Sequence, residues 1–155
     1  MMQVDEVETP IGMAYLALDG EALRALRFER AFEGQRVKSR AAECVREYFA
    51  GNLRAFDGLA LASIGTEFQR KVWQLLRDIP PGETRTYGEL AALLGSHPRA
   101  VGSANGSNPI GIVVPCHRVI AKGGGMCGYA WGTDRKEWLL RHEREAVAHR
   151  SLLSA

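Results

Sequence analysis

Two capping boxes and one helix-breaking segment constrain the fold of the second half of the chain. Thr66 is followed three residues later by Gln69, and Thr86 by Glu89, a pattern in which two side chains satisfy the first free amides of a helix. The Pro-Pro-Gly sequence at residues 80–82 ends the first of these helices. The second half is therefore predicted to consist of short helices joined by tight turns, which excludes a long coiled coil.

A third helix is expected directly after the second. Gly95 suits the end of the second helix, and Pro98 suits the first position of the next, which is expected to run to about Ser107. Two short helices joined this closely are typical of a helix-turn-helix, a motif found in DNA-binding proteins and also in proteins that never contact DNA. The apolar positions expected to face the core are Phe68, Val72, Leu75, Leu76, Ile79, Leu90, Leu93 and Leu94.

The third helix carries few bulky side chains. Glycine at two interior positions, Gly102 and Gly106, costs about 2 kcal/mol relative to alanine, so tight packing or the close approach of a ligand must compensate. A helix this thin can press against the minor groove of DNA, where the long Arg99 side chain at its start reaches the bases. The candidate DNA contacts on this helix are Arg99, Ala100, Gly102 and Ser103.

The first part of the chain has a different pattern. Residues 13–18 are apolar and end at Asp19-Gly20, a hairpin turn signal, which predicts a small antiparallel sheet. From Gln35 the apolar residues recur at helical spacing until Gly51. The predicted organisation is a sheet-plus-helix domain over residues 1–56, a linker over 57–65, a helical domain over 66–145 and a C-terminal tail over 146–155.

Composition and charge narrow the class of protein. Of the 155 residues, 46% are hydrophobic and 25% are charged, as in an ordinary globular protein, and the longest apolar stretches are too short to cross a membrane. The net charge is +2, but residues 1–65 carry −2 and residues 66–143 carry +3, so a polyanion is expected to bind to the second half. Three cysteines cannot all pair and have no C-x-x-C spacing, which indicates reduced thiols in the cytoplasm and no zinc site.

One cysteine stands in a chemically distinctive position. Residues 111–114 form a short apolar run, typical of a buried strand, that leads through a proline into Cys116 and His117. A histidine and a cation beside a cysteine favour the thiolate, which is the nucleophilic form. A small buried side chain followed by a surface histidine is the other interpretation of the same residues.

The surrounding motifs carry a family resemblance. Residues 115–119 (PCHRV) are followed by a glycine-rich stretch, Gly-Tyr and residues 135–143 (RKEWLLRHE), and are preceded by residues 79–90 (IPPGETRTYGEL) and 99–110 (RAVGSANGSNPI). Over residues 66–143 the sequence resembles the O6-alkylguanine-DNA alkyltransferases. The resemblance implies an α+β fold class. The implied fold consists of a small N-terminal antiparallel sheet with a helix, similar to the ribonuclease-H-like domain of that family, and a mostly helical C-terminal domain. The C-terminal domain would contain a helix-turn-helix and an active-site loop.

The same resemblance implies a direct-reversal repair reaction. Cys116 would accept the alkyl group from O6 of guanine, and O4 of thymine is a second candidate target. His117, acting through a water molecule, would take the thiol proton, and Glu143 would orient that histidine. Because the thioether product is not a leaving group, the activity would be that of a methylated-DNA protein-cysteine S-methyltransferase that acts once, without a metal or another cofactor.

Further residues take DNA-related roles through this resemblance. Arg99 matches the residue that fills the space left by the rotated nucleotide, and Tyr87 matches the tyrosine that contacts guanine N3. Asn108 matches the asparagine that links the recognition helix to the active-site strand. Arg118 is expected to contact DNA.

The base pocket is assigned in the same way. The carbonyls of Cys116 and Val119 would accept from the exocyclic amine of guanine, and the amide of Ala130 would donate to O6. Tyr129 would form a wall of the pocket, and the bulky Trp131 would narrow it. The glycines that suit a loop lying close to a flat base are Gly123, Gly124, Gly125 and Gly128.

The expected partner is double-stranded DNA that carries O6-alkylguanine. A monomer would bind it through the minor groove and rotate the damaged nucleotide into the pocket, in the cytoplasm and associated with the nucleoid. Two alternatives stay open. One is an alkyltransferase-like protein that binds damage without an acceptor cysteine, and the other is a cysteine hydrolase, which would turn over.

Overall fold

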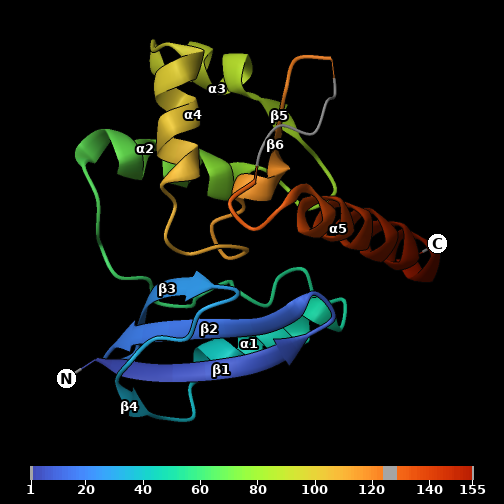
Figure 1. Cartoon of the computed structure of the whole chain (residues 1–155). Coiled ribbons are helices and arrows are strands. Elements are labelled where there is room, and N and C mark those ends of the chain that lie inside the picture. Colours follow the sequence, from blue (N-terminus) through green and yellow to red (C-terminus); the bar gives the residue numbers. More distant parts are fainter. Residues whose placement is uncertain (1, 124–128, 155) are drawn as a thin grey trace. The chain divides into compact units, whose positions relative to one another are not determined.

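The chain forms two compact units. The computed structural model describes residues 2–123 and 129–154 (Figure 1). Among the predicted loop residues, Gly124, Gly125 and Gly128 lie outside the described residues, as does Cys127. The first unit consists of Met1–Ile64 with Pro109–Gly111, and the second consists of Gly65–Asn108 with Ile112–Ala155.

The first unit is built on a sheet in the strand order β3-β2-β1-β4. β1, β2 and β3 are antiparallel neighbours, and β4 adds a short parallel pairing to β1. Gly20 adopts a φ of 63°, as the predicted hairpin turn between β2 and β3 requires, so that prediction is confirmed. The strands are β1 Gln3–Thr9, β2 Gly12–Asp19, β3 Ala22–Arg27 and β4 Gln35–Arg36.

The helix α1, Arg40–Phe49, packs against β1 (Figure 1). The prediction of a helix from Gln35 was wrong at its start, because Gln35 lies in β4 and the helix is capped by Ser39. The Ser39 hydroxyl accepts from the amide of Ala42 at 3.1 Å. The carboxylate of Asp5 accepts from the amide and the hydroxyl of Ser39 at 2.8 and 2.7 Å. These hydrogen bonds, and not apolar periodicity, determine where α1 begins.

Residues 57–64 belong to the first unit, although the sequence pattern placed residues 57–65 in a linker. Part of this segment runs beside β3, where Leu23 exchanges two backbone hydrogen bonds of 2.9 Å with it. Pro109–Gly111 also lies along β3 and exchanges backbone hydrogen bonds with Leu26. The edge of the sheet at β3 is therefore covered by segments that have no periodic apolar pattern of their own.

Helices make up most of the second unit. The capping boxes of α2 and α3 are present as predicted, with Thr66 and Thr86 as the capping residues, and Gly95 ends α3 in the left-handed region at a φ of 60°. The two-residue strands β5 and β6 pair in parallel. The elements are α2 Glu67–Asp78, β5 Arg85–Thr86, α3 Tyr87–Leu94, α4 Pro98–Gly106, the 3-10 helix η1 Cys116–Arg118, β6 Val119–Ile120 and α5 Thr133–Ser154.

Two expectations about these helices need correction. Leu93 was expected to face the core but is 71% exposed, and Leu90 and Ala91 are the buried residues of α3. The residues predicted as a C-terminal tail instead continue α5 as far as Ser154, so Glu143 lies near the middle of that helix. Within the described residues, no helix is both long enough and apolar enough to span a membrane.

Candidate active site

Cys116 begins η1 and is held in a hydrogen-bonded turn. Its amide donates to the carbonyl of Val114 at 2.8 Å, and the amide of Val119 donates to the carbonyl of Cys116. The predicted strand over residues 111–114 was wrong, because these residues form a buried turn in which Ile112 has a φ of 69°. A short apolar run does not distinguish a strand from other buried structure.

The thiol of Cys116 is buried and is 5% exposed. Burial raises the pKa of this thiol, while a hydrogen bond with the side chain of Asn108 and the positive charge of Lys136 partly lower it. Nδ2 of Asn108 also donates to the carbonyl of Val114 at 2.8 Å. Asn108 therefore joins the end of α4 to the turn that holds the thiol. Because burial raises the pKa of the thiol, the thiol is protonated at rest.

His117 and Glu143 form a hydrogen-bonded pair in the interior of the second unit. Nε2 of His117 lies 2.7 Å from Oε2 of Glu143, and both side chains are 0% exposed. Because an ionised carboxylate only accepts hydrogen bonds, Nε2 carries a proton, and in the neutral form of the imidazole Nδ1 then has a lone pair. Nδ1 is buried and has no hydrogen-bond partner among the described residues. A free acceptor on the residue after Cys116 is what a general base for a thiol requires.

Arg118 completes the surroundings of Glu143. Its Nε and Nη2 donate to the two carboxylate oxygens at 2.8 and 2.9 Å, and its Nη1 donates to the carbonyl of Ile79 at 2.7 Å. Burial alone would raise the pKa of Glu143, but His117 and Arg118 hold it well below its usual range. The prediction that Arg118 contacts DNA is corrected, because its side chain is 8% exposed and its donors bind inside the protein. The PCHRV motif does not reveal which way this side chain points.

Aromatic rings line the site beside His117. The ring of Tyr129 lies edge-on to that of His117 at 6.5 Å and to that of Trp131 at 5.5 Å between centroids. The Tyr129 hydroxyl is buried without a hydrogen-bond partner in the described part of the chain. Burial, followed by the charges of Cys116 and Glu143, raises its pKa well above the usual value. Tyr129, the predicted wall residue, thus lies beside the histidine, and Trp131, which was predicted to narrow the pocket, packs against Tyr129.

The other predicted base contacts flank these aromatic residues in the chain. Val119 is fully buried at the start of β6, and Ala130 is exposed between Tyr129 and Trp131.

α3 and α4 pack together as the predicted helix-turn-helix (Figure 1). Arg99, Ala100 and Ser103 are exposed on α4. A Cβ atom built on Gly102 would lie 3.7 Å from the ring of Tyr87, the first residue of α3. Since this is an ordinary contact distance, packing against Tyr87 does not require glycine at position 102.

Sequence reasoning missed side chains that hold α4 in place. Nδ1 of His97 accepts from the amide of Arg99 at 3.0 Å and caps the helix, although serine, threonine, aspartate and asparagine are the usual capping residues. Nε1 of Trp73 in α2 donates to the carbonyl of Ala104 at 2.8 Å. α4 is therefore attached to α2 by a specific side-chain contact.

Lys136 is a further site residue that sequence reasoning missed. It is 0% exposed, and its Nζ donates to the carbonyl of Val119 at 2.6 Å. Leu139, Leu140 and Glu143, which follow it at spacings of three, four and seven residues, are buried as well. This helical spacing placed Lys136 on the buried face of α5 and was the available signal.

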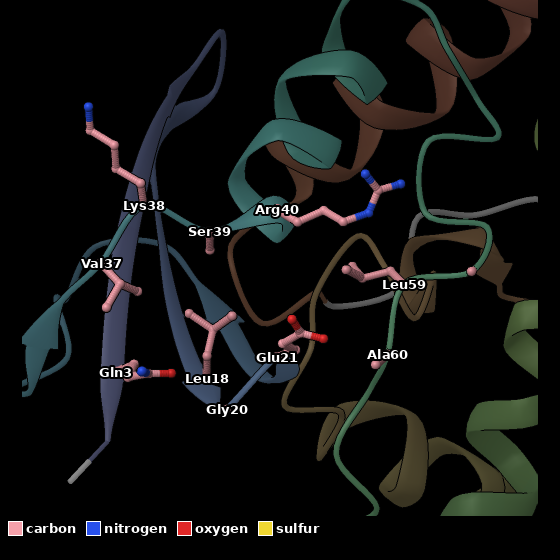
Figure 2. A pocket seen from close by; sticks show the side chains of 11 residues that line it. Gln3, Leu18, Gly20, Glu21, Val37, Lys38, Ser39, Arg40, Leu59 and Ala60 are labelled. Atoms are coloured by element: carbon pink, nitrogen blue, oxygen red, sulfur yellow. The ribbon is translucent and has the colours of Figure 1, made fainter.

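The first unit contains a pocket of about 610 Å³, with Leu18, Val37, Arg40 and Leu59 among its lining residues (Figure 2). Neither cysteine nor histidine is among the residues that line it. The nucleophile and base described above therefore have no counterpart in this pocket, and the thiol site of the second unit is the candidate active site.

Comparison with known sequences gives consistent similarities. Residues 67–145 match the family model of the DNA-binding domain of 6-O-methylguanine DNA methyltransferase. A methylated-DNA--protein-cysteine methyltransferase of Shigella flexneri is 46% identical over 160 residues, which cover 90% of this chain and 94% of that protein. A protein of the same name from Methanosarcina acetivorans is 47% identical over 148 residues, which cover 88% of this chain and 94% of that protein.

Solved structures show the same relationship. The crystal structure of Mycobacterium tuberculosis O6-methylguanine methyltransferase is similar with a TM-score of 0.85 and 42% sequence identity, over 94% of each chain. The crystal structure of M. tuberculosis OGT in complex with DNA is similar with a TM-score of 0.84. These similarities associate the buried thiol site with an α+β fold that binds DNA. The chain belongs to the O6-methylguanine-DNA methyltransferase family.

Proposed function

We propose that this chain repairs alkylated double-stranded DNA by transferring an alkyl group from O6 of guanine to Sγ of Cys116, once per molecule. The observation that carries the proposal is the arrangement of His117. Its Nε2 is fixed by Glu143 at 2.7 Å, and its buried Nδ1 has no hydrogen-bond partner among the described residues. The names of the relatives, which describe methylated DNA and a protein cysteine, support the same reaction.

The reaction balances without a cofactor. Nδ1 of His117 takes the thiol proton, directly or through a water molecule, and the thiolate of Cys116 attacks the alkyl carbon. A carbon–sulfur bond forms as the carbon–O6 bond breaks, and the electron pair passes to guanine, which takes up a proton. We assign the donation of that proton, at N3, to Tyr87. Because a thioether is not a leaving group, the reaction stops after one transfer.

The DNA is bound through the exposed residues of α4. Arg99 fills the space of the rotated nucleotide, and the small residues Ala100, Gly102 and Ser103 allow the helix to approach the minor groove closely. The chain acts as a monomer, since the nucleophile and the base lie on one chain, and it works where the DNA is, in the cytoplasm and at the nucleoid.

The flipped base is read mainly by the protein backbone. The carbonyls of Cys116 and Val119 accept from the exocyclic amine, and the amide of Ala130 donates to O6. Tyr129 and Trp131 enclose the ring.

Alkyl transfer is tested with duplex DNA that carries radiolabelled O6-methylguanine. Label is expected to move to Cys116 until one equivalent per protein is bound, because the thioether cannot be released. Peptide mapping locates the label, and a titration of DNA against protein gives the stoichiometry.

Other outcomes separate the alternatives. Tight binding to damaged DNA without transfer would indicate a damage-binding protein of the alkyltransferase-like kind. Release of product beyond one equivalent would indicate a hydrolase and would overturn the proposal.

Trp131 is expected to limit the size of the alkyl group. The Trp131→Ala variant should react with free O6-benzylguanine about tenfold faster or more than the wild type, because removing the indole makes room beside Tyr129. Trp131→Phe, which keeps an aromatic ring, is the matched control and should change the rate less. Loss of activity against labelled DNA measures inactivation, and equal rates in wild type and Trp131→Ala would show that Trp131 does not narrow the pocket.

A further inference from the structure

Lys136 is a cation of the site that the proposed reaction does not use. Its side chain is fully buried in the second unit, between α5 and the turn that begins at Cys116. Burial of an ammonium group is unfavourable unless the group is hydrogen-bonded and faces compensating charge. A solvated lysine at this position of α5 would avoid that cost. The buried position therefore calls for an explanation in terms of what the ammonium contacts.

The contact is with the backbone that follows Cys116. Nζ of Lys136 donates to the carbonyl of Val119 at 2.6 Å, and the amide of the same residue donates to the carbonyl of Cys116. Both polar backbone groups of Val119 are thus engaged, which fixes the orientation of its peptide groups. A carbonyl oxygen has two lone pairs, so a carbonyl oriented by the ammonium can still accept a second hydrogen bond.

We propose that Lys136 is a positioning residue that aims the carbonyl of Val119 at the exocyclic amine of the target guanine and places a positive charge beside the forming thiolate of Cys116. This inference rests on the proposed function, because the base contact of Val119 belongs to that proposal. It adds a residue that discriminates guanine from a purine without the exocyclic amine.

The charge acts on the sulfur together with its other neighbours. Titratable side chains at the site include Lys136 and Tyr129, which interact electrostatically with Cys116, and the hydrogen-bonded pair of His117 and Glu143. The positive charge of Lys136 works against burial and lowers the pKa of the Cys116 thiol, whereas the charge of Arg118 is already paired with Glu143. Lys136 thus favours the thiolate when the proton leaves.

The first test compares two duplexes that differ only in the exocyclic amine. One carries O6-methylguanine and the other carries O6-methylhypoxanthine, which has no amine at C2. Wild type is expected to transfer the methyl group faster from O6-methylguanine. Lys136→Met should lower that rate about tenfold or more, as for the loss of a hydrogen bond to a charged group, and should lower the O6-methylhypoxanthine rate less. The ratio of the two rates therefore moves toward one.

The controls separate this role from general destabilisation and from failure of the proposed function. Lys71→Met removes a lysine whose side chain is 61% exposed and should leave both rates unchanged. An unchanged ratio in Lys136→Met, even with both rates lowered, would mean that Lys136 only stabilises the fold and would overturn the inference. If wild type transfers nothing from either duplex, the proposed function itself fails. Circular dichroism checks folding, and Lys136→Gln serves as a second neutral variant if Lys136→Met does not fold.

The second test needs no DNA. The rate at which iodoacetamide alkylates Cys116 is measured against pH in wild type, Lys136→Met and Lys136→Arg. Loss of the positive charge should move the midpoint to higher pH and slow labelling at neutral pH about tenfold, whereas Lys136→Arg, which keeps the charge, should stay close to wild type. A midpoint that is the same in Lys136→Met and wild type would overturn the electrostatic part of the inference.

Discussion

Replacing Cys116 with alanine is expected to abolish alkyl transfer completely while leaving affinity for duplex DNA largely unchanged. The variant loses the sulfur that forms the new bond, and no other group described at the site is a nucleophile of comparable strength. The exposed contact residues of α4 are untouched, since Cys116 lies on η1 and is 5% exposed. Transfer is measured with labelled DNA, and binding is measured by fluorescence anisotropy.

Cys44 provides the matched control. It is also a buried free cysteine, but it lies on α1 of the first unit. Cys44→Ala should transfer one equivalent of label, as wild type does. Residual transfer in Cys116→Ala would show that a different residue is the acceptor. Loss of transfer in Cys44→Ala but not in Cys116→Ala would indicate that Cys44 is that acceptor.

Arg118→Met is expected to destabilise the protein by about 3–5 kcal/mol, because it leaves the carboxylate of Glu143 in the interior without its bidentate partner. The carbonyl of Ile79 loses a donor as well. The free energy of unfolding is measured by urea denaturation at pH 7. At that pH, above the unfolded pKa of about 4.3 for glutamate, the full contribution of Glu143 is present. Because the pKa of Glu143 is lower in the folded state than in the unfolded state, this contribution is lost as the pH falls from about 4.3 toward the folded pKa.

The ion pair of Arg36 with Glu6 tests whether the loss of stability depends on the burial of a pair or on the distance between its charged groups. Arg36 pairs with Glu6 at 2.7 Å, but its side chain is 72% exposed, so Arg36→Met should destabilise the protein far less than Arg118→Met does. A double variant, Arg118→Met with Glu143→Leu, removes the buried charge altogether and should recover part of the stability while transfer remains impaired. Equal losses for Arg118→Met and Arg36→Met would contradict the importance assigned to the buried pair.

Local signals in the sequence predicted the helices of the second unit well. The capping boxes at Thr66 and Thr86 and the left-handed Gly95 depend on bonds between residues close in the chain, and the structure confirms all three. The hairpin at Gly20 is of the same kind. The resemblance over residues 66–143 then supplied the candidate site, including Cys116, which the local pattern alone left ambiguous.

The wrong predictions involve partners distant in the sequence. The start of α1 depends on Asp5, more than thirty residues before Ser39. The direction of the Arg118 side chain depends on Glu143, which lies 25 residues away. The turn at residues 111–114 is buried on all sides, so its apolar residues resemble those of a strand. None of these partners could be identified from spacing alone.

The buried, protonated state of Cys116 also affects the protein before it meets damage. Peroxides and stray electrophiles react with thiolates that they can reach, and this thiol is both covered and held in its less reactive form. Because the reaction uses each protein molecule only once, the thiol has to stay unreacted until the protein meets damage. The burial of Cys116 therefore protects the unreacted thiol, and in the proposed reaction His117 removes its proton when a damaged base occupies the pocket.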